Sequence, residues 1–110
     1  MLPDSLVRQF KTIVGADNAW TDATDLHTYS YDAAVVEPVQ PGLIVRPPSA
    51  GSLGETVRLC NQNGLPLTVR GAGTNLSGGT VPLSGGVVIL TNGMKAIAEI
   101  NEADMYAVVQ

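Results

Sequence analysis

The sequence is poor in the residue types that metal, disulfide and nucleic-acid sites need. It has one cysteine, Cys60, and one histidine, His27, in 110 residues. One cysteine cannot close a disulfide within the chain, and one thiol with one imidazole argues against a zinc-type metal site. Lysine and arginine total 6 against 10 acidic residues, and no basic run offsets the formal net charge of −4. Nucleic acid is therefore a poor candidate partner, because phosphate binding needs a clustered basic surface.

Long apolar runs are also missing. No stretch reaches the ~18 consecutive apolar residues of a bilayer-spanning helix. Residues 1–5 lack the basic and apolar parts of a signal peptide, so the expected compartment is the cytoplasm. Charged residues make up only 15% and hydrophobic residues 45% of the chain, which argues against disorder and allows one modest core. This length predicts one small domain, without room for separate cofactor and substrate domains.

Hydrophobic spacing predicts two helices in the first third of the chain. An amphipathic helix is expected over residues 4–14, ended by Gly15. The apolar positions that share its face are Leu6, Phe10, Ile13 and Val14. A short helix or turn is expected over residues 22–31. The side chains expected to face inward from it are Leu26, Tyr29 and Tyr31.

A strand, a helix and a second strand are expected in the middle of the chain. Residues 43–46 form a short apolar run that Pro47 ends, and residues 67–70 form the second strand. Between them, Ser52 and Glu55 have the spacing of a capping box at a helix start. The buried stripe of this helix is predicted to be Leu53, Val57 and Cys60. Such a βαβ unit predicts two parallel strands joined by a right-handed crossover.

The last third predicts one buried strand and a hairpin. Residues 87–91 are almost wholly apolar, as in a strand covered on both faces. Residues 96–100 and 105–109 alternate around a polar turn and predict an antiparallel pair. The fold class expected is therefore α/β, with a small, mostly parallel sheet, helices on one side and an added hairpin.

The chain ends at Gln110, directly after an apolar strand. This predicts that the 110 residues are a fragment of a longer protein, the alternative being a strand that closes the sheet. A final apolar strand without neighbours also predicts self-association.

Residues 70–80 form the segment most suited to binding a ligand. They read RGAGTNLSGGT, with four glycines, two threonines and one serine between two apolar strands. Glycine lets the backbone adopt positive φ and approach a ligand closely, and consecutive N–H groups can form a nest for an anion. The segment therefore suits a pyrophosphate, held by many N–H bonds with few cationic side chains. The alternative is a surface loop whose glycines provide only flexibility.

The loop differs from two better-known phosphate-binding motifs. A dinucleotide-binding fingerprint needs a third glycine where Leu76 stands, and a helix directly afterwards. A P-loop needs Gly-Lys-Ser/Thr, which is absent from residues 70–80.

At this loop the sequence resembles the FAD-binding domain of the vanillyl-alcohol oxidase and p-cresol methylhydroxylase family of flavoproteins. The family pattern is Arg-Gly-x-Gly-Thr-x-Leu-Ser-Gly-Gly after a Gly-x-Pro strand start, matched here by residues 70–79 and 64–66. Further matches are the Tyr31-Asp32 pair, Pro47-Pro48-Ser49, and Gly85 to Ile89 leading to Met94. Within the family, the chain resembles the branch of glycolate oxidase and the FAD-linked D-lactate dehydrogenases.

The resemblance implies a PCMH-type FAD-binding domain, of which residues 1–110 would be the N-terminal half and first subdomain. The second half of that domain and the cap domain would be absent. In the family the loop wraps the FAD pyrophosphate, and Pro47 lies where the first strand ends against the cofactor. The loop residues to which FAD contact is carried over are Arg70, Gly71, Ala72, Gly73, Thr74, Asn75, Ser77, Gly78 and Gly79. Thr74 stands where some relatives attach FAD through histidine, so the resemblance implies non-covalent FAD.

The implied parent protein is an FAD-dependent oxidoreductase that converts a 2-hydroxy acid, of the glycolate or D-lactate type, to the 2-oxo acid. Its electrons would pass to an acceptor or partner subunit. Substrate-binding residues and metal-binding histidines of the relatives lie in later parts of their chains. No catalytic residue is therefore assigned, and the fragment alone is expected to be inactive. Two alternatives remain: a non-catalytic flavin- or nucleotide-binding module, and an oxidoreductase of the same superfamily with another substrate.

Other single residues have simpler interpretations. His27 has no carboxylate partner in the motif, so a surface or packing role is expected. Cys60 is expected to be a buried, inert thiol. Three aspartates fit capping and turns better than a cation site: Asp22, Asp25 and Asp32. Arg70 remains open between contact with the pyrophosphate and pairing with an acidic neighbour.

Overall fold

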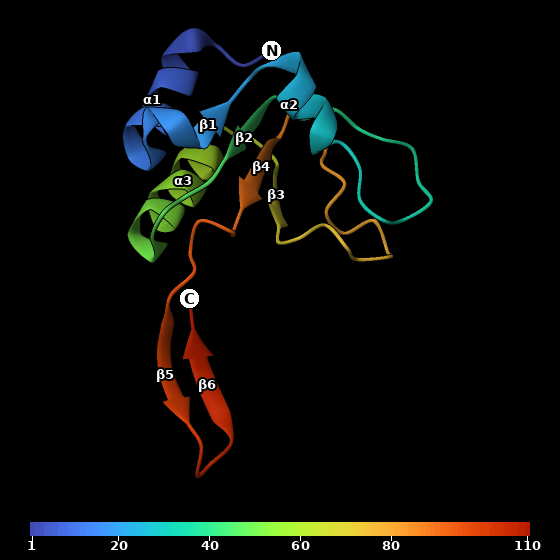
Figure 1. Cartoon of the computed structure of the whole chain (residues 1–110). Helices are drawn as coiled ribbons and strands as arrows, with labels where there is room; N and C mark the ends of the chain where they lie inside the picture. The colour runs from blue at the N-terminus through green and yellow to red at the C-terminus, as the bar shows by residue number, and fades with distance from the viewer.

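A four-stranded sheet forms the body of the protein, and a separate hairpin projects from it (Figure 1). The computed structural model describes residues 1–110. The sheet order is β1-β2-β4-β3, and its strands are β1 (Ala19–Trp20), β2 (Leu43–Val45), β3 (Leu67–Arg70) and β4 (Val87–Leu90). Strand β4 pairs in parallel with both β2 and β3, whereas β1 pairs antiparallel with β2. The prediction of a mostly parallel sheet is therefore confirmed, although β1 is too short to have been predicted.

Helices cover both faces of this sheet. Helices α1 (Asp4–Val14) and α3 (Ala50–Gln62) lie over one face, and the short helix α2 (Ala23–Thr28) lies over the other (Figure 1). The smaller core cluster, beneath α2, consists of Leu26, Ile44, Val88 and Leu90. The expectation of helices on one side only was wrong, because strands as apolar as β2 and β4 need cover on both faces.

The first two helices begin and end close to the predicted positions. Helix α1 buries Leu6, Phe10 and Val14 and ends at Gly15, whose φ is +92°. Helix α2 begins after Asp22, whose carboxylate accepts a hydrogen bond from the Thr24 N–H at 2.9 Å. Leu26 is buried as predicted, but Tyr31 is 46% exposed, so its expected inward orientation was wrong.

Helix α3 begins earlier than its predicted capping box. Ser49 is the N-cap, and it exchanges hydrogen bonds with Ser52 in a box placed three residues before the predicted pair. The buried stripe is centred on Thr56, whose hydroxyl donates to the Ser52 carbonyl at 2.8 Å and is thereby satisfied. Val57 lies at the edge of this stripe and is 40% exposed, which corrects its predicted burial.

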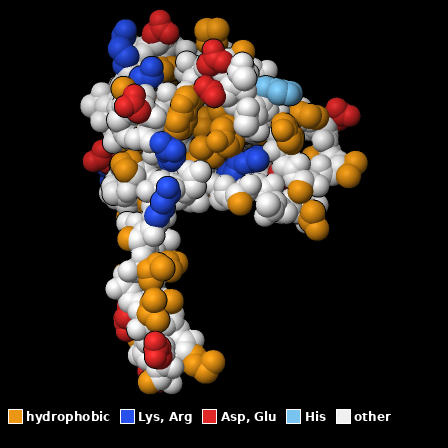
Figure 2. Space-filling view, in the orientation of Figure 1, with side chains coloured by type: hydrophobic (Ala, Val, Ile, Leu, Met, Phe, Trp, Pro, Cys, Tyr) orange, Lys and Arg blue, Asp and Glu red, His pale blue; other side chains and the backbone are white.

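The hairpin consists of β5 (Ile97–Asn101) and β6 (Tyr106–Val109), paired antiparallel as predicted. It extends away from the body and contributes to overall dimensions of 50 × 35 × 23 Å (Figure 1). Figure 2 shows hydrophobic side chains along its length, and the exposed ones include Ile97, Ile100, Met105, Val108 and Val109. None of the helices has the length and apolar character that crossing a bilayer requires.

Candidate functional site

The glycine-rich loop leaves the sheet at the carboxyl end of β3 and returns at the start of β4. Its residues 71–86 run beside the segment that connects α2 to β2 (Figure 1). In that segment, Asp32 accepts a hydrogen bond from Asn75 of the loop, and Val36 lies 3.7 Å from a Cβ built on Gly78. Two segments more than 40 residues apart in the sequence therefore form this part of the molecule together.

The backbone N–H groups of the loop are largely unused. None of the N–H groups of residues 71–79 donates a hydrogen bond within the chain. The first partners appear at Thr80, which donates to Asp32, and at Val81, which donates to the Gly78 carbonyl at 3.1 Å. A continuous row of free N–H groups is what a nest for an anionic oxygen requires.

Four glycines make this row accessible in two different ways. Gly73 and Gly78 have φ values of +72° and +75°, which L side chains rarely adopt. Gly71 and Gly79 do not have positive φ values, and a Cβ at either position would make only ordinary van der Waals contacts. The nearest atoms to a built Cβ are 3.9 Å away at Gly71 and 4.0 Å away at Gly79. Their missing side chains leave room for a ligand to approach the backbone.

Arg70 is held by uncharged groups at the start of the loop. Its guanidinium lies 5.3 Å from the centre of the Tyr29 ring and donates to the Tyr31 carbonyl. It also packs so closely on Gly73 that a Cβ there would lie 2.2 Å from the nearest guanidinium nitrogen. Arg70 is only 9% exposed. Of the two roles left open for Arg70, pairing with an acidic neighbour is not observed, and the contacts present make Arg70 a support for the turn at Gly73.

Asp32 joins the connecting segment to the loop. One carboxylate oxygen, Oδ1, accepts from the Ala34 N–H at 2.8 Å and closes a local turn. The other, Oδ2, accepts from Asn75 Nδ2 at 2.7 Å and from the Thr80 N–H at 3.3 Å. The bond from Ala34, with those from Asn75 and Thr80, holds the pKa of Asp32 below its ordinary value of 3.8, although burial acts in the opposite direction. The turn role expected for Asp32 is present, but its contacts with the loop were not foreseen.

The predicted cofactor-binding residues differ in their exposure to solvent. The exposed ones are Gly71, Ala72, Thr74, Ser77 and Gly79, whereas Gly73, Asn75 and Gly78 are partly buried. The Asn75 side chain is turned to Asp32 and accepts from the Thr80 hydroxyl at 3.0 Å, which leaves its backbone N–H for a ligand. Pro47 is buried at the end of β2, and β4 separates β2 from β3. Pro47 therefore lies at the same edge of the sheet as the loop, one strand away from it, and its contact with FAD stays a prediction.

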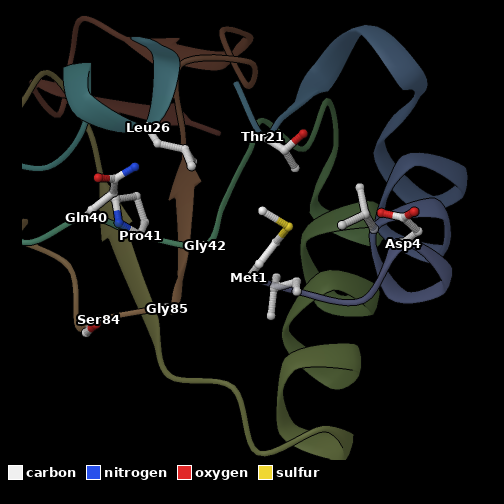
Figure 3. A pocket seen from close by; sticks show the side chains of 11 residues that line it. Met1, Asp4, Thr21, Leu26, Gln40, Pro41, Gly42, Ser84 and Gly85 are labelled. Atoms are coloured by element: carbon white, nitrogen blue, oxygen red, sulfur yellow. The ribbon is translucent and has the colours of Figure 1, made fainter. Parts of the chain in front are cut away.

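The larger of two cavities lies at the edge of the sheet opposite the loop. Its volume is about 450 Å³, and Met1 lies between its two walls (Figure 3). Gly42 and Gly85, which line it, directly precede β2 and β4, so the cavity is at the amino ends of these parallel strands. Parallel sheets bind their ligands at the carboxyl ends. The loop after β3 is thus the better candidate site.

A second, smaller cavity does lie at the carboxyl ends of β2 and β4. Its volume is about 270 Å³, and it is lined by Asn18, Arg46, Pro48, Asn92, Gly93 and Lys95. Arg46 donates to Asn18 Oδ1 at 3.0 Å and lies 5.3 Å from the centre of the Trp20 ring. No sequence motif indicates this basic, polar hollow, because its residues come from separate segments of the chain.

Comparison with known proteins gives a consistent result for family and fold. Residues 41–110 match the family described as "FAD binding domain". The chain is 32% identical over 110 residues to glycolate oxidase subunit GlcD of Bacillus subtilis, covering 100% of this chain and 23% of that protein. The chain thus spans about a quarter of the length of such relatives.

Solved structures of other proteins share this fold, among them the following two. That of p-cresol methylhydroxylase with bound substrate has a TM-score of 0.83 and 24% identity, over 96% of this chain and 21% of that one. The 4-ethylphenol oxidase of Gulosibacter chungangensis, in complex with isoeugenol, has a TM-score of 0.84 and 28% identity over the same shares. The likeness to p-cresol methylhydroxylase, at this identity, concerns the fold alone.

Proposed function

The chain belongs to the FAD binding domain family, and on this premise we propose that its residues 70–79 hold the pyrophosphate of FAD. The observation that carries the proposal is the row of unpartnered backbone N–H groups at residues 71–79. Neutral N–H donors suit a pyrophosphate in a chain whose net charge is −4. When bound, FAD supplies a flavin ring that can accept a hydride, and the protein supplies binding and orientation.

The residues of the loop have different parts in this proposal. Gly71 and Gly79 let the phosphates approach the backbone, because a ligand can occupy the space where a side chain would stand. The exposed Thr74 and Ser77 add hydroxyl donors. Arg70 acts indirectly, by supporting the turn at Gly73. Since the loop contains no histidine, the proposed binding is non-covalent, and acid precipitation of the loaded protein is expected to release free FAD.

Glycine variants test this assignment within the 110-residue chain. Gly71→Ala and Gly79→Ala are expected to preserve the fold and to raise the Kd for FAD, measured by the change in flavin fluorescence. Gly54→Ala is the matched control, because Gly54 lies in α3 with no atom within 4 Å of a built Cβ. It is expected to leave the Kd unchanged. Equal affinity in the loop variants and the control would contradict the assignment to residues 70–79.

For the whole protein, the proposed activity is the oxidation of a 2-hydroxy acid of the glycolate or D-lactate type to the 2-oxo acid. Residues 1–110 would form the N-terminal half of its FAD-binding domain, and the remaining half with a cap domain would complete the site. The 32% identity to a glycolate oxidase subunit supports this substrate class, and the subunit name favours further subunits or an electron acceptor. A cytoplasmic location is part of the same proposal.

A second substrate class is supported by the 28% identity to 4-ethylphenol oxidase. The two classes are separated by mixing the full-length flavoprotein with each substrate without oxygen and following the loss of flavin absorbance near 450 nm. Reduction by glycolate or D-lactate, but not by 4-ethylphenol, is the expected result. Reduction by the phenol alone would replace the 2-hydroxy acid proposal.

A further inference from the structure

Asp32 places a carboxylate directly against the loop that is proposed to bind an anion. Its Oδ2 lies 2.7 Å from Asn75 Nδ2, 3.3 Å from the Thr80 N and 3.1 Å from the Thr80 Oγ1. The residue is only 9% exposed, and Ala34 occupies its other oxygen. Both carboxylate oxygens of Asp32 therefore accept hydrogen bonds from donors of the protein itself.

We infer that Asp32 is a positioning residue for FAD binding, which clamps residues 75 and 80 and so holds the free N–H groups of the loop in a binding conformation. The inference rests on the proposed function of residues 70–79. It adds a role for a side chain outside that segment, which contacts the loop rather than the cofactor.

The loop needs such a clamp because its own backbone supplies almost no restraint. Residues 71–79 donate no backbone hydrogen bond within the chain, and four of the residues from 70 to 80 are glycines, which have the greatest conformational freedom. Side chains therefore supply most of the order. Arg70 fixes the beginning of the loop at Gly73, and Asp32 fixes its second half at Asn75 and Thr80.

Because Asp32 is charged, the direction in which Asp32→Asn changes FAD affinity tests the inference. A carboxylate near a pyrophosphate opposes binding by Coulomb repulsion. If Asp32 acted only through its charge, Asp32→Asn would tighten FAD binding. If Asp32 is a clamp, the same change leaves one acceptor oxygen in place of two. Either the donors of Asn75 and Thr80 or the Ala34 N–H then lose their acceptor, and binding weakens.

The experiment compares the 110-residue chain with its Asp32→Asn, Thr80→Val and Glu37→Gln variants. Glu37 lies exposed in the same connecting segment and makes no side-chain hydrogen bond, so Glu37→Gln removes one negative charge and leaves the clamp intact. Two quantities are measured. The Kd for FAD is obtained by fluorescence titration, and the order of residues 75–80 without FAD is obtained from ¹H–¹⁵N heteronuclear NOE values. Far-UV circular dichroism confirms that each variant is folded.

Asp32→Asn is expected to lower the NOE values of residues 75–80 and to raise the Kd. If the binding-competent population falls to about a tenth, the Kd rises roughly tenfold. Thr80→Val, which keeps the N–H but removes the hydroxyl, is expected to have an intermediate effect on both quantities. Glu37→Gln is expected to change neither.

Unchanged or tighter FAD binding by a folded Asp32→Asn protein overturns the inference. So does weaker binding with undisturbed loop order, because Asp32 would then act by another route. A wild-type chain that does not bind FAD, with a loop that Asp32→Asn still disorders, contradicts the proposed function at this chain length and leaves the clamp supported. If Asp32→Asn leaves the NOE values of residues 75–80 unchanged, the clamp is overturned, whatever the Kd for FAD.

Discussion

At the scale of residues, the glycines of one loop have two distinct purposes. Gly73 is required by the fold, since its φ is +72° and the Arg70 guanidinium occupies the position of a side chain. Gly79 has no such restraint, and its nearest neighbour to a built Cβ is 4.0 Å away. The fold therefore does not require glycine at position 79, which agrees with the proposed approach of a ligand to the backbone there.

Gly73→Ala is therefore expected to lower the free energy of unfolding, whereas Gly79→Ala should leave it nearly unchanged. A non-glycine residue with left-handed backbone costs about 1–2 kcal/mol, and displacement of Arg70 from Tyr29 and Tyr31 adds to this. Urea unfolding followed by circular dichroism measures both values. Similar stabilities for the two variants would contradict both the backbone strain and the packing cost expected at Gly73.

Cys60 gives a prediction that depends on pH. Burial raises the pKa of this thiol from 9.0 to about 11, so the folded chain holds the proton more tightly than the unfolded chain. The resulting stabilisation is complete below pH 9 and is lost as the pH rises through the folded pKa. The free energy of unfolding should fall by up to ~1.4 kcal/mol per pH unit in this window.

A Cys60→Ala variant is the control for other groups that titrate between pH 9.0 and about 11, and it should show a shallower decline. At neutral pH, a thiol reagent such as DTNB is expected to label Cys60 only when denaturant is added. Rapid labelling of the native chain would show that the thiol is accessible, contrary to its buried position.

The site was predictable from sequence where it is continuous and unpredictable where it is assembled by the fold. Residues 70–79 stand together and are distinguished by glycine and small polar side chains. Asp32 lies 43 residues before Asn75. The sequence indicated a turn at Asp32 and a match of the Tyr31-Asp32 pair to the family, but neither indicated its contact with the loop. The assignment of individual residues to FAD contact stays a prediction.

At the scale of elements, apolar patterns predicted most of the architecture. The buried strands β2 and β4 and the helix α1 were predicted because each has an uninterrupted or strictly periodic apolar pattern. Strand β1 was missed because two residues have no pattern, and its pairing with β2 depends on tertiary contacts. The start of α3 was misplaced because Ser49-Ser52 and Ser52-Glu55 have the same spacing, and spacing alone cannot choose between them.

The start of α3 can be tested by mutation. Ser49→Ala removes the N-cap that accepts from the Ser52 N–H at 3.2 Å, and it should lower the free energy of unfolding by about 1 kcal/mol. Glu55→Ala, at an exposed position inside the helix, should change it by less than about 0.5 kcal/mol. Thermal or urea unfolding measures the difference. A larger loss from Glu55→Ala would favour the capping box that the spacing first indicated.

At the scale of the whole molecule, the hairpin contrasts with the body. The body buries its apolar residues in two clusters on either side of the sheet, whereas no residue of β5 or β6 is buried. Ile97, Ile100 and Val109 are each more than 60% exposed. Exposed apolar strands with open edges are prone to pair with other chains.

The 110-residue chain is therefore expected to self-associate at high concentration, through the hairpin. Size-exclusion chromatography with light scattering should show a mass that rises with concentration. Ile100→Lys, on exposed β5, should shift the chain toward the monomer without changing its circular dichroism spectrum. A monomer at all concentrations in the unmodified chain would contradict this expectation.

FAD is expected to bind to the loop after β3 and not in the larger cavity at the opposite edge of the sheet. This choice between two sites can be tested by following the backbone amide resonances of the ¹⁵N-labelled chain as FAD is added. We predict saturable shifts at residues 71–79, with little change at Val7, Gln40, Gly42 or Ser84 around the cavity. Shifts confined to the cavity residues, or no shift at residues 71–79 at saturating FAD, would contradict the proposed site.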